Sequence, residues 1–575
     1  MEKGNSFVDY LNSMNNANSK NENALAESQI TSEYYEYIKV NRKISDILFN
    51  KLNESPKGII LTGHAGDGKT SILAQILDKY GYFENKNELE ESDTLKDKIF
   101  YIKDMSELSK SKQKTALEEF LKSPKKNNIS SILISNTGPL INTFRQLLGK
   151  DKFSDLESEI IESLDTNDFK KIIVNIDVEE YEFYVVNIAI LENIYLSKEI
   201  FNNILNEKLW DKCEHCEIRK KCPIYTNYKN CKLNEERISK FIEALYTWFK
   251  YNESRLTIRQ MLSHLSFSIT ANLTCKDIYE NNYSLYDYAF PNLFFGYCGT
   301  EYIKDSTNIK AIKELNKISI DKKTLPIDIE KKLFSEEDFS VFDEPISEII
   351  SNYIDMEQKN VEAYNSERNN IRCSIRRFYM LASNNYNNYE DMIKNIFSDS
   401  FLLFLNMSKE EILSPKEKKW LKDIIFNSLF RLFTGVYSKN NEILYLTVRK
   451  NMDDIQNVQI ITGELSKSDI LIKHSHVTKE IEEFKDNYTT NLKFGRIDEL
   501  YEINYPMLNF MVQTCEGEVF TLLNPTLTFG INKIKSDLMN KYKNIDEDTV
   551  DILIIRKNSI EKEKLEINKD GIEVL

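Results

Sequence analysis

The sequence predicts an α/β fold for the N-terminal part of the chain, followed by a helical middle and a β-rich C-terminal part. In the N-terminal part, short apolar segments alternate with helical stretches, at residues 58–61, 99–102, 132–134, 172–176 and 183–190. This alternation indicates a parallel sheet with helices on both faces. Helical spacing of apolar residues then dominates up to about residue 437. Strand-like segments return after that point, at 443–448, 458–461, 470–472, 507–512, 519–523, 550–555 and 565–574.

The length of 575 residues exceeds what one hydrophobic core supports, so several domains are expected. The patterns favour a flexible leader, an NTPase-like α/β core, a helical lid, a helical domain and a β-rich α+β C-terminal domain, at residues 1–30, 31–195, 196–300, 301–437 and 438–575. The leader is assigned on composition, because Asn, Ser, Lys and Glu dominate it.

Composition narrows the classes of function. The formal net charge of −15 argues against a chain that coats nucleic acid by itself, because polyanion binding depends on Lys and Arg. A local basic groove and a DNA-binding partner both stay open. No apolar run reaches the roughly 18 residues of a membrane span, and the polar N-terminus has no signal-peptide core. We therefore expect a cytoplasmic protein that does not enter a membrane.

The strongest motif runs from Gly63 to Thr70 and fits G-x-x-x-x-G-K-[ST] in full. An apolar strand precedes it and an amphipathic helix follows it, as in a P-loop. There, backbone N–H groups surround the phosphates, the lysine reaches the β- and γ-phosphates, and the threonine hydroxyl binds Mg²⁺. We expect ATP with Mg²⁺ as the ligand of an AAA-like P-loop NTPase. The expected nucleotide-binding residues are Gly63, His64, Ala65, Gly66, Asp67, Gly68, Lys69, Thr70 and Ser71.

The ends of later strands supply candidate catalytic residues. Asp104 is the expected second Mg²⁺ ligand, with Asp177 as the weaker alternative. The next position, where a water-activating acid often stands, is Met105. Glu107 is the nearest acid, although a solvent-exposed role in a first helical turn suits it equally. Asn136 suits a residue that orients the attacking water, while Asn-Thr-Gly is also an ordinary turn.

Cysteines are concentrated in one short segment, as Cys213, Cys216, Cys222 and Cys231. Zn²⁺ takes four thiolates in tetrahedral geometry, and a C-x2-C pair followed by another pair is the usual spacing. The uneven spacing also allows an iron–sulfur cluster, and His215 is a possible replacement ligand. Reduced, unliganded cysteines are the third interpretation. The scattered remainder are expected to be buried, at Cys275, Cys298, Cys373 and Cys515.

Two groups of arginines have helical spacing. Arg255 and Arg259 would share one helix face, from which one of them could stabilise charge on a γ-phosphate. On pattern alone, a surface helix with two solvated arginines is favoured. A second stripe, Arg368, Arg372 and Arg376, is suited to nucleic-acid phosphates, a neighbouring subunit's nucleotide or an acidic partner. An internal salt-bridge face explains that stripe equally well.

Five ordered segments together resemble the DptF family, P-loop ATPases associated with DNA phosphorothioation-dependent restriction in bacteria. These segments are 61–70, 103–107, 134–138, the Cys-x2-Cys…Cys-Pro cluster and Leu256-Thr-Ile-Arg259. The resemblance implies that Lys69 and Thr70 hold nucleotide and Mg²⁺, that Asp104 holds the metal, and that Asn136 and Arg259 sense the γ-phosphate. It also implies companion subunits, one of them a HerA-like translocating ATPase, that together attack DNA lacking the phosphorothioate mark.

The leading hypothesis is thus an ATP-binding and ATP-hydrolysing subunit of a bacterial restriction complex for antiviral defence, which reaches DNA through the complex. Because Met105 occupies the usual base position, slow turnover or use as a nucleotide-dependent switch is expected. The alternative is a signalling or scaffold ATPase that controls protein assembly without direct DNA contact. A stand-alone DNA motor is disfavoured by the net charge of −15.

Overall fold

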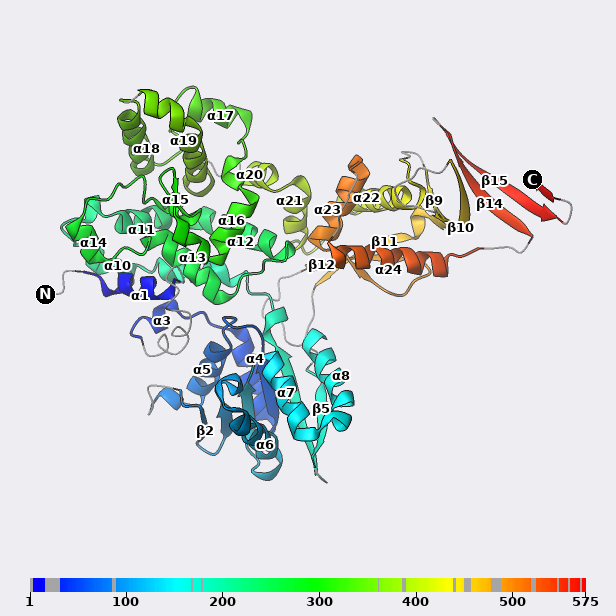
Figure 1. The fold of residues 1–575 in the computed structure, drawn as a ribbon, viewed down its shortest axis with the longest axis horizontal. Coiled ribbons are helices and arrows are strands. Elements are labelled where there is room, and N and C mark those ends of the chain that lie inside the picture. Colours follow the sequence, from blue (N-terminus) through cyan, green and yellow to red (C-terminus); the bar gives the residue numbers. More distant parts are fainter. Residues whose placement is uncertain are drawn as a thin grey trace. The chain divides into compact units, whose positions relative to one another are not determined.

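A computed structural model gives the fold of the chain (Figure 1). The structure describes residues 4–15, 32–84, 89–166, 169–176, 179–359, 361–384, 389–437, 441–448, 457–476, 488–518, 524–544, 548–556, 559–568 and 571–574. Within these ranges the chain forms two compact units. Residues up to Met392 belong to the first unit and residues from Ile393 onward belong to the second.

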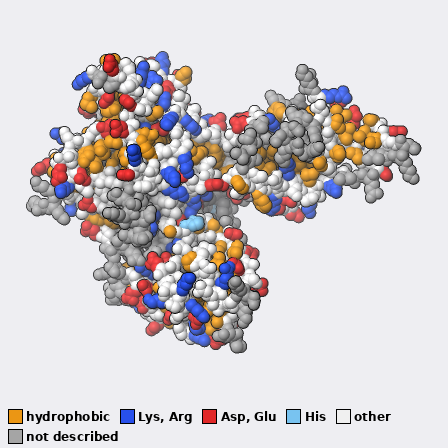
Figure 2. All heavy atoms as spheres, in the orientation of Figure 1, with side chains coloured by type: hydrophobic (Ala, Val, Ile, Leu, Met, Phe, Trp, Pro, Cys, Tyr) orange, Lys and Arg blue, Asp and Glu red, His pale blue; other side chains and the backbone are white. Residues whose placement is uncertain are grey.

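Both signs of charge are spread over the surface. The chain has 76 Lys and Arg against 91 Asp and Glu. On the face drawn in Figure 2, basic side chains are scattered among acidic ones. Such a mixed face does not have the continuous basic stripe by which proteins usually track a nucleic-acid backbone.

The first unit contains a six-stranded sheet in the order β2-β3-β4-β1-β6-β5. Its strands are β1 Gly58–Thr62, β2 Ser92–Leu95, β3 Ile99–Ile102, β4 Ser130–Ile134, β5 Lys171–Ile176 and β6 Glu179–Asn187. The four central strands β3, β4, β1 and β6 run parallel. The predicted α/β character of this part of the chain is therefore confirmed.

The two edge strands are antiparallel to their neighbours. The predicted parallel arrangement is therefore wrong for β5, and β2 was not predicted at all. Only residues 96–98 join β2 to β3, and only residues 177–178 join β5 to β6. A connection this short makes a hairpin, because a parallel neighbour needs a crossover of a dozen or more residues. Lys96 and Asp97 both have a φ of 51°, as tight hairpin turns require.

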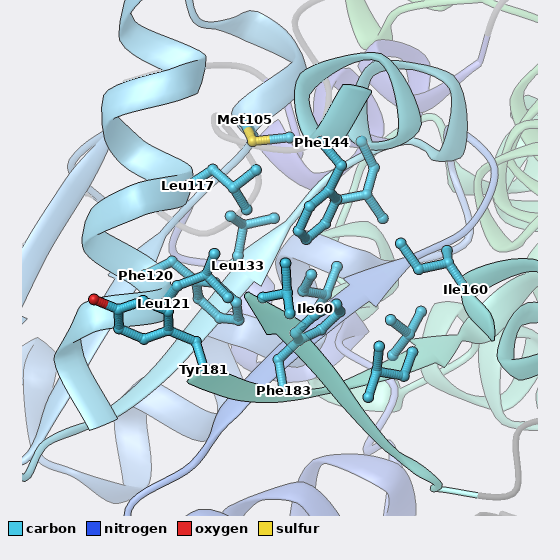
Figure 3. Packing of buried hydrophobic residues seen from close by; sticks show 14 of the residues in the cluster. Ile60, Met105, Leu117, Phe120, Leu121, Leu133, Phe144, Ile160, Tyr181 and Phe183 are labelled. Atoms are coloured by element: carbon cyan, nitrogen blue, oxygen red, sulfur yellow. The ribbon is translucent and has the colours of Figure 1, made fainter. Parts of the chain in front are cut away.

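Helices cover both faces of the sheet, namely α4 Lys43–Glu54, α5 Lys69–Lys79, α6 Lys110–Lys126, α7 Thr137–Leu148 and α8 Lys150–Thr166. Successive strand residues point to opposite faces. Ile59 and Leu61 of β1 therefore join the core beneath α4 and α5. Ile60 points the other way, into a core with Leu117 and Phe144 (Figure 3). This packing fixes both ends of β1, and hence the loop that follows it.

A helical region follows the sheet, as predicted. Its helices are α9 Leu196–Ile204, α10 Glu207–Glu214, α11 Pro223–Leu233, α12 Glu235–Tyr251, α13 Ile258–Thr270, α14 Cys275–Glu280, α15 Phe290–Phe294, α16 Lys310–Ile318, α17 Ile327–Phe334, α18 Glu344–Glu357, α19 Val361–Ala382 and α20 Tyr389–Ile396. A small hairpin interrupts them, formed by β7 Tyr297–Cys298 and β8 Glu301–Tyr302. Among the described residues, no helix combines the length and apolar character that a membrane span requires.

The N-terminal segment is helical where the structure describes it. Residues Ser6–Met14 form α1, which packs against α13, and a short helix α3 covers Tyr35–Ile38. Phe7 and Leu11 of α1 are fully buried. The prediction of a flexible leader is therefore wrong for residues 4–15, because the apolar stripe of one short helix was hidden by the polar composition around it. Residues 16–31 of that leader lie outside the described ranges.

The second unit combines helices with two antiparallel sheets. The helices are α21 Asp399–Met407, α22 Pro415–Thr434, α23 Tyr505–Glu516 and α24 Pro525–Lys541. One sheet has the order β16-β15-β14-β10-β9 and the other β11-β12-β13. Their strands are β9 Ile443–Val448, β10 Val458–Ser466, β11 Ile470–His476, β12 Tyr488–Phe494, β13 Tyr501–Glu502, β14 Thr549–Ile555, β15 Ile560–Asn568 and β16 Gly571–Val574. The predicted β-rich character is confirmed.

One predicted strand of this unit, 507–512, is wrong, because it lies inside helix α23. Asn504 caps that helix, Pro506 stands in its first turn, and Gly517 ends it with a φ of 103°. These start and stop signals outweigh a short apolar run, which by itself fits a strand or a buried helix equally well. The predicted strand at 519–523 lies outside the described residues.

Candidate phosphate-binding site

The loop predicted to bind nucleotide connects two buried elements. β1 ends at Thr62 with all of its residues buried, and α5 begins at Lys69. The loop turns back on itself because Gly63, Gly66 and Gly68 have φ of 153°, 90° and 86°, conformations that other residues rarely adopt. Gly68 is the N-cap residue of α5 and has no side chain to cap it. The first N–H groups of α5 are thus available to an anion.

The Lys69 ammonium ties this loop to the sheet. Its Nζ donates to the carbonyl oxygens of Gly63 and His64, both at 3.0 Å, and to Oδ1 of Asn136 at 2.9 Å. The side chain is buried, and burial lowers the pKa of Lys69, an effect that two nearby carboxylates oppose. The three acceptors are neutral oxygens, whereas a phosphate oxygen would give the buried charge an anionic partner.

Asn136 and Asp104 meet Lys69 at the carboxyl edge of the sheet. β4 lies between β1 and β3 and runs parallel to both, so these strands end at one edge. Asp104 Oδ1 accepts the N–H of Ser106 at 2.8 Å, and Ser106 Oγ accepts the N–H of Asn136 at 2.9 Å. Asp104 is also the charge that does most to raise the pKa of Lys69. Thr70 stands beside them in the first turn of α5, partly buried.

The position usually taken by a water-activating acid is apolar. Met105 opens the short 3-10 helix Met105–Glu107 and is fully buried in the core below the sheet (Figure 3). Glu107 stands at the exposed end of the same turn. The nearest acid to the predicted Mg²⁺ ligand is therefore held on the surface side of the turn. Asp177, the weaker alternative for the metal, lies outside the described residues.

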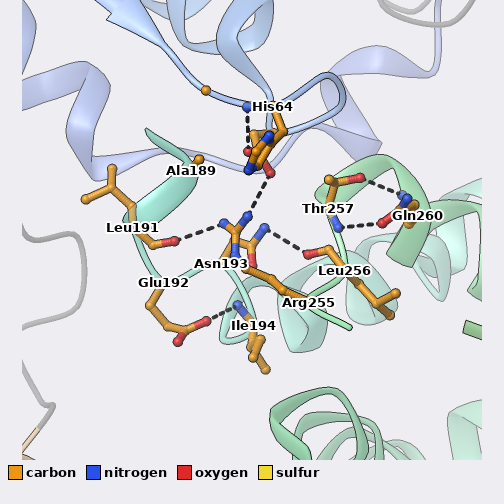
Figure 4. A network of polar contacts seen from close by, with 12 residues as sticks. His64, Ala189, Leu191, Glu192, Asn193, Ile194, Arg255, Leu256, Thr257 and Gln260 are labelled. Carbon is orange, nitrogen blue, oxygen red and sulfur yellow. Dashed lines mark hydrogen bonds and ion pairs between the residues drawn. The ribbon is translucent and has the colours of Figure 1, made fainter. Parts of the chain in front are cut away.

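Residues before α13 reach the loop from the helical region. Arg255 NH1 lies 3.2 Å from Oδ1 of Asp67, and its NH2 donates to the Leu191 carbonyl at 3.1 Å (Figure 4). Asp67 is 2 % exposed, and its second oxygen accepts the N–H of His64 at 3.1 Å. Arg255 and the His64 N–H thus bind the two carboxylate oxygens of Asp67, and these contacts stabilise the curled conformation of the loop.

Arg259 also lies at the loop, which its backbone contacts. Its backbone N–H donates to the Gly66 carbonyl at 3.3 Å. Burial lowers the pKa of Arg259, and its charge in turn lowers the pKa of Lys69. The prediction that Arg255 and Arg259 share a helix face is wrong, because a capping box at Thr257 starts α13 after Arg255.

Sequence reasoning missed Arg42, which precedes α4 and is 3 % exposed. Its NH1 donates to the Asp67 carbonyl at 3.1 Å. No motif marks this arginine, because the contact joins residues far apart in the sequence. Of the remaining predicted loop residues, His64 and Ala65 are exposed, and Ser71 Oγ lies 3.4 Å from the Tyr35 hydroxyl.

The predicted arginine stripe on α19 is only partly exposed. Arg376 makes a two-pronged ion pair with Glu330, at 2.8 and 3.0 Å. Arg372 lies over the Phe334 ring, with 5.4 Å to its centroid. Arg368 is exposed. The internal salt-bridge interpretation therefore describes Arg376, and Arg368 is the member of the stripe best placed for an external phosphate.

The cysteine segment spans α10, α11 and the turn between them. Cys213, Cys216 and Cys222 are partly buried, whereas Cys231 is fully buried on α11. In the described ranges, no group of three or more His, Cys, Asp or Glu side chains stands in an arrangement that could hold a metal ion. His215 is the C-cap residue of α10 and is exposed.

Comparisons of the chain with models of protein families, with curated proteins and with solved structures find no match. The interpretation of the site therefore depends on its own geometry. Its defining feature is one lysine at the start of α5, held between the loop carbonyls and an asparagine at the end of β4.

Proposed function

We propose that the chain is a P-loop ATPase of the AAA-like type that binds ATP with Mg²⁺. Lys69 would hold the β- and γ-phosphates, and Thr70 with Asp104 would hold Mg²⁺. Asn136 would orient the attacking water, and Arg259 would stabilise charge on the γ-phosphate. The observation that carries the proposal is the 2.9 Å contact between Lys69 Nζ and Asn136 Oδ1, with Asp104 just after the next parallel strand, β3.

Charge supports a polyanionic ligand at this loop. Lys69 is buried and Arg259 is partly buried, and burial lowers the pKa of each. Two partly desolvated cations beside the free N–H groups of a helix start favour a phosphate chain over a neutral ligand. An adenine base is not specified by these contacts, and it enters the proposal through the resemblance to ATPases.

The contacts of residues 255–259 support a switch rather than a fast motor. Arg255 and Arg259 connect the loop to α13 through Asp67 and Gly66. A phosphate that moves the loop would therefore move the start of α13. We assign water activation to Glu107, and its exposed position together with the apolar Met105 supports slow hydrolysis.

The biological setting that we propose is a bacterial restriction complex. Support comes from the ordered segments that resemble the DptF family, and the proposal includes companion subunits with a HerA-like translocase among them. DNA lacking phosphorothioate would be engaged by the complex. The scaffold alternative shares the same site and differs only in lacking DNA among the complex's ligands.

Steady-state ATP hydrolysis with Mg²⁺ tests the assigned roles. Asp104→Asn and Asn136→Ala are expected to lower kcat by about 100-fold, as removal of one transition-state contact does. Glu107→Gln is expected to lower kcat by at least about tenfold if it activates the water. Glu119→Gln, an exposed acid on α6, is the control and should match the wild type. Wild-type rates in both Asp104→Asn and Asn136→Ala would refute the active site.

A further inference from the structure

Asn5, close to the N-terminus, joins two cysteines that are distant in the sequence. Its side-chain Nδ2 donates to Sγ of Cys213 at 3.3 Å, and its backbone N–H donates to Sγ of Cys275 at 3.4 Å. Cys213 ends α10, whereas Cys275 begins α14. Cys275 was expected to be a scattered, buried thiol, but the fold brings it to the cysteine segment.

The other two thiols of the group lie in the connection between α10 and α11. Sγ of Cys216 is 3.3 Å from the hydroxyl of Tyr279, which stands one turn after Cys275 on α14. Sγ of Cys222 caps α11 by accepting the N–H of Tyr225 at 3.5 Å. The N–H of Cys216 closes a turn on the Cys213 carbonyl at 3.2 Å, which keeps the C-x2-C pair together.

Cys231 does not belong to this group. It is fully buried and lines a small cavity with Ile238, Phe290 and Phe378. Burial alone raises the pKa of the Cys231 thiol. By contrast, Cys213, Cys216, Cys222 and Cys275 are partly buried, and their sulfurs make the contacts described above.

We propose that Cys213, Cys216, Cys222 and Cys275 bind one Zn²⁺ ion, with Cys275 in place of the Cys231 ligand that the sequence suggested. Each thiol gives up its proton on binding, so one Zn²⁺ and four thiols yield a complex of charge −2 and four protons. The side chains must turn toward one point, because the described residues do not yet form a metal shell.

The surroundings suit such a complex. Three of the four sulfurs already accept N–H donors, from Asn5 twice and from Tyr225, and such bonds stabilise metal-bound thiolates. Arg219, Lys220 and Lys221 lie between Cys216 and Cys222 and offset the negative charge. The ion would join α10 and the start of α11 to α14, and it would be structural, since all four coordination positions are filled.

Zinc content of the full-length chain tests the ligand set. The wild type and Cys231→Ser are expected to retain about one Zn²⁺ per chain after dialysis against a weak chelator, as a site with four thiolates should. Cys275→Ser and Cys213→Ser are expected to lose it. Zinc retained in Cys275→Ser and lost in Cys231→Ser would overturn the proposal, as would iron or no metal in the wild type.

Alkylation of the wild-type chain gives a second measurement. It uses no substitution, so an unfolded variant cannot account for the result. With zinc bound, Cys213, Cys216, Cys222 and Cys275 should resist a thiol reagent and should become reactive together when a strong chelator removes the metal. The partly buried Cys298, Cys373 and Cys515 are the reference, and their reactivity should not respond to the chelator. Protection that excludes Cys275, or that chelator does not change, would contradict the proposed site.

Discussion

Gly66 meets two demands at once. Its φ of 90° curls the loop around the space where a phosphate would lie. A Cβ at this position would stand 2.9 Å from Thr257 Oγ1 and 3.2 Å from Cβ of Arg259. The absence of a side chain therefore has two effects. It allows the positive φ without the strain that other residues would have, and it leaves room for the segment before α13 to contact the loop.

We predict that Gly66→Ala lowers stability by about 1–3 kcal/mol and lowers Mg·ATP affinity, because backbone strain and a steric clash both act on the loop. Gly138→Ala is the control. A Cβ there meets nothing within 4 Å, and Gly138 lies inside the first turn of α7, so it should be neutral or slightly stabilising. Thermal unfolding and nucleotide titration of the two variants measure the difference. Equal stability and affinity in both would contradict the role given to Gly66.

The residues of the site differ in how far the sequence could predict them. Lys69 and Thr70 belong to a local motif, so their neighbours in sequence are also their neighbours in space. Asp104 and Asn136 follow from one further rule, that parallel strands end at a common edge. Arg42 follows from neither, because it reaches the loop through a contact between distant segments. Such contacts are set by packing and carry no local signal.

At the scale of single elements, α13 connects the loop to the helical region. His264 lies in its buried middle, with Nδ1 2.8 Å from the Tyr246 hydroxyl and Nε2 2.8 Å from the Phe294 carbonyl. Both ring nitrogens therefore have a hydrogen-bond partner when the ring is neutral. The Nε2–H group donates to the Phe294 carbonyl, and Nδ1 accepts from the Tyr246 hydroxyl. Burial lowers the pKa of His264 from 6.5 to about 4.

A pH dependence of stability follows from His264. Its folded-state pKa lies below the unfolded value, so the stability of the neutral form is present above pH 6.5 and is lost as pH falls toward about 4. The loss is expected to reach about 3 kcal/mol, at about 1.4 kcal/mol per unit of pKa difference. Denaturant unfolding of the wild type and His264→Gln measures it, since all other titrating groups are shared. If the unfolding free energy of His264→Gln depended on pH as steeply as that of the wild type, this account would be contradicted.

Elements also show where sequence patterns stop being informative. β5 was predicted as a strand of a parallel sheet, but the short connection to β6 makes it antiparallel, and the edge strand β2 was not predicted. The segment 507–512 is apolar enough for either structure, and its caps at Asn504 and Gly517 decide for a helix. α1 was missed because its apolar stripe is only nine residues long within a polar stretch. Each error arose where local composition was used without its boundary signals.

At the scale of the whole molecule, the net charge bears on whether the chain can bind nucleic acid by itself. The net charge of −15 opposes binding to another polyanion. In the predicted arginine stripe, Arg376 forms an ion pair with Glu330, whereas Arg368 is exposed to solvent. Both observations support the proposal that the chain engages DNA together with companion subunits.

We predict that the isolated chain does not bind duplex DNA at physiological salt, and that Arg368→Glu does not change this. Fluorescence anisotropy of a labelled duplex, measured over a range of salt concentrations, gives the answer. Tight binding by the wild type that weakens steeply with salt would contradict the prediction, because that slope reports phosphate contacts by this chain. Loss of such binding in Arg368→Glu would assign the contact to α19.

The central claim is that Lys69 holds the phosphates of ATP, and titration calorimetry with Mg·ATP tests it most directly. The wild type should bind, and Lys69→Ala should bind at least about tenfold more weakly, because a charged hydrogen bond contributes roughly 1.5–3 kcal/mol. Lys79→Ala, on the same helix and in a surface ion pair with Asp46, should bind like the wild type. Equal affinity in Lys69→Ala and Lys79→Ala, or no binding by the wild type, would contradict the account.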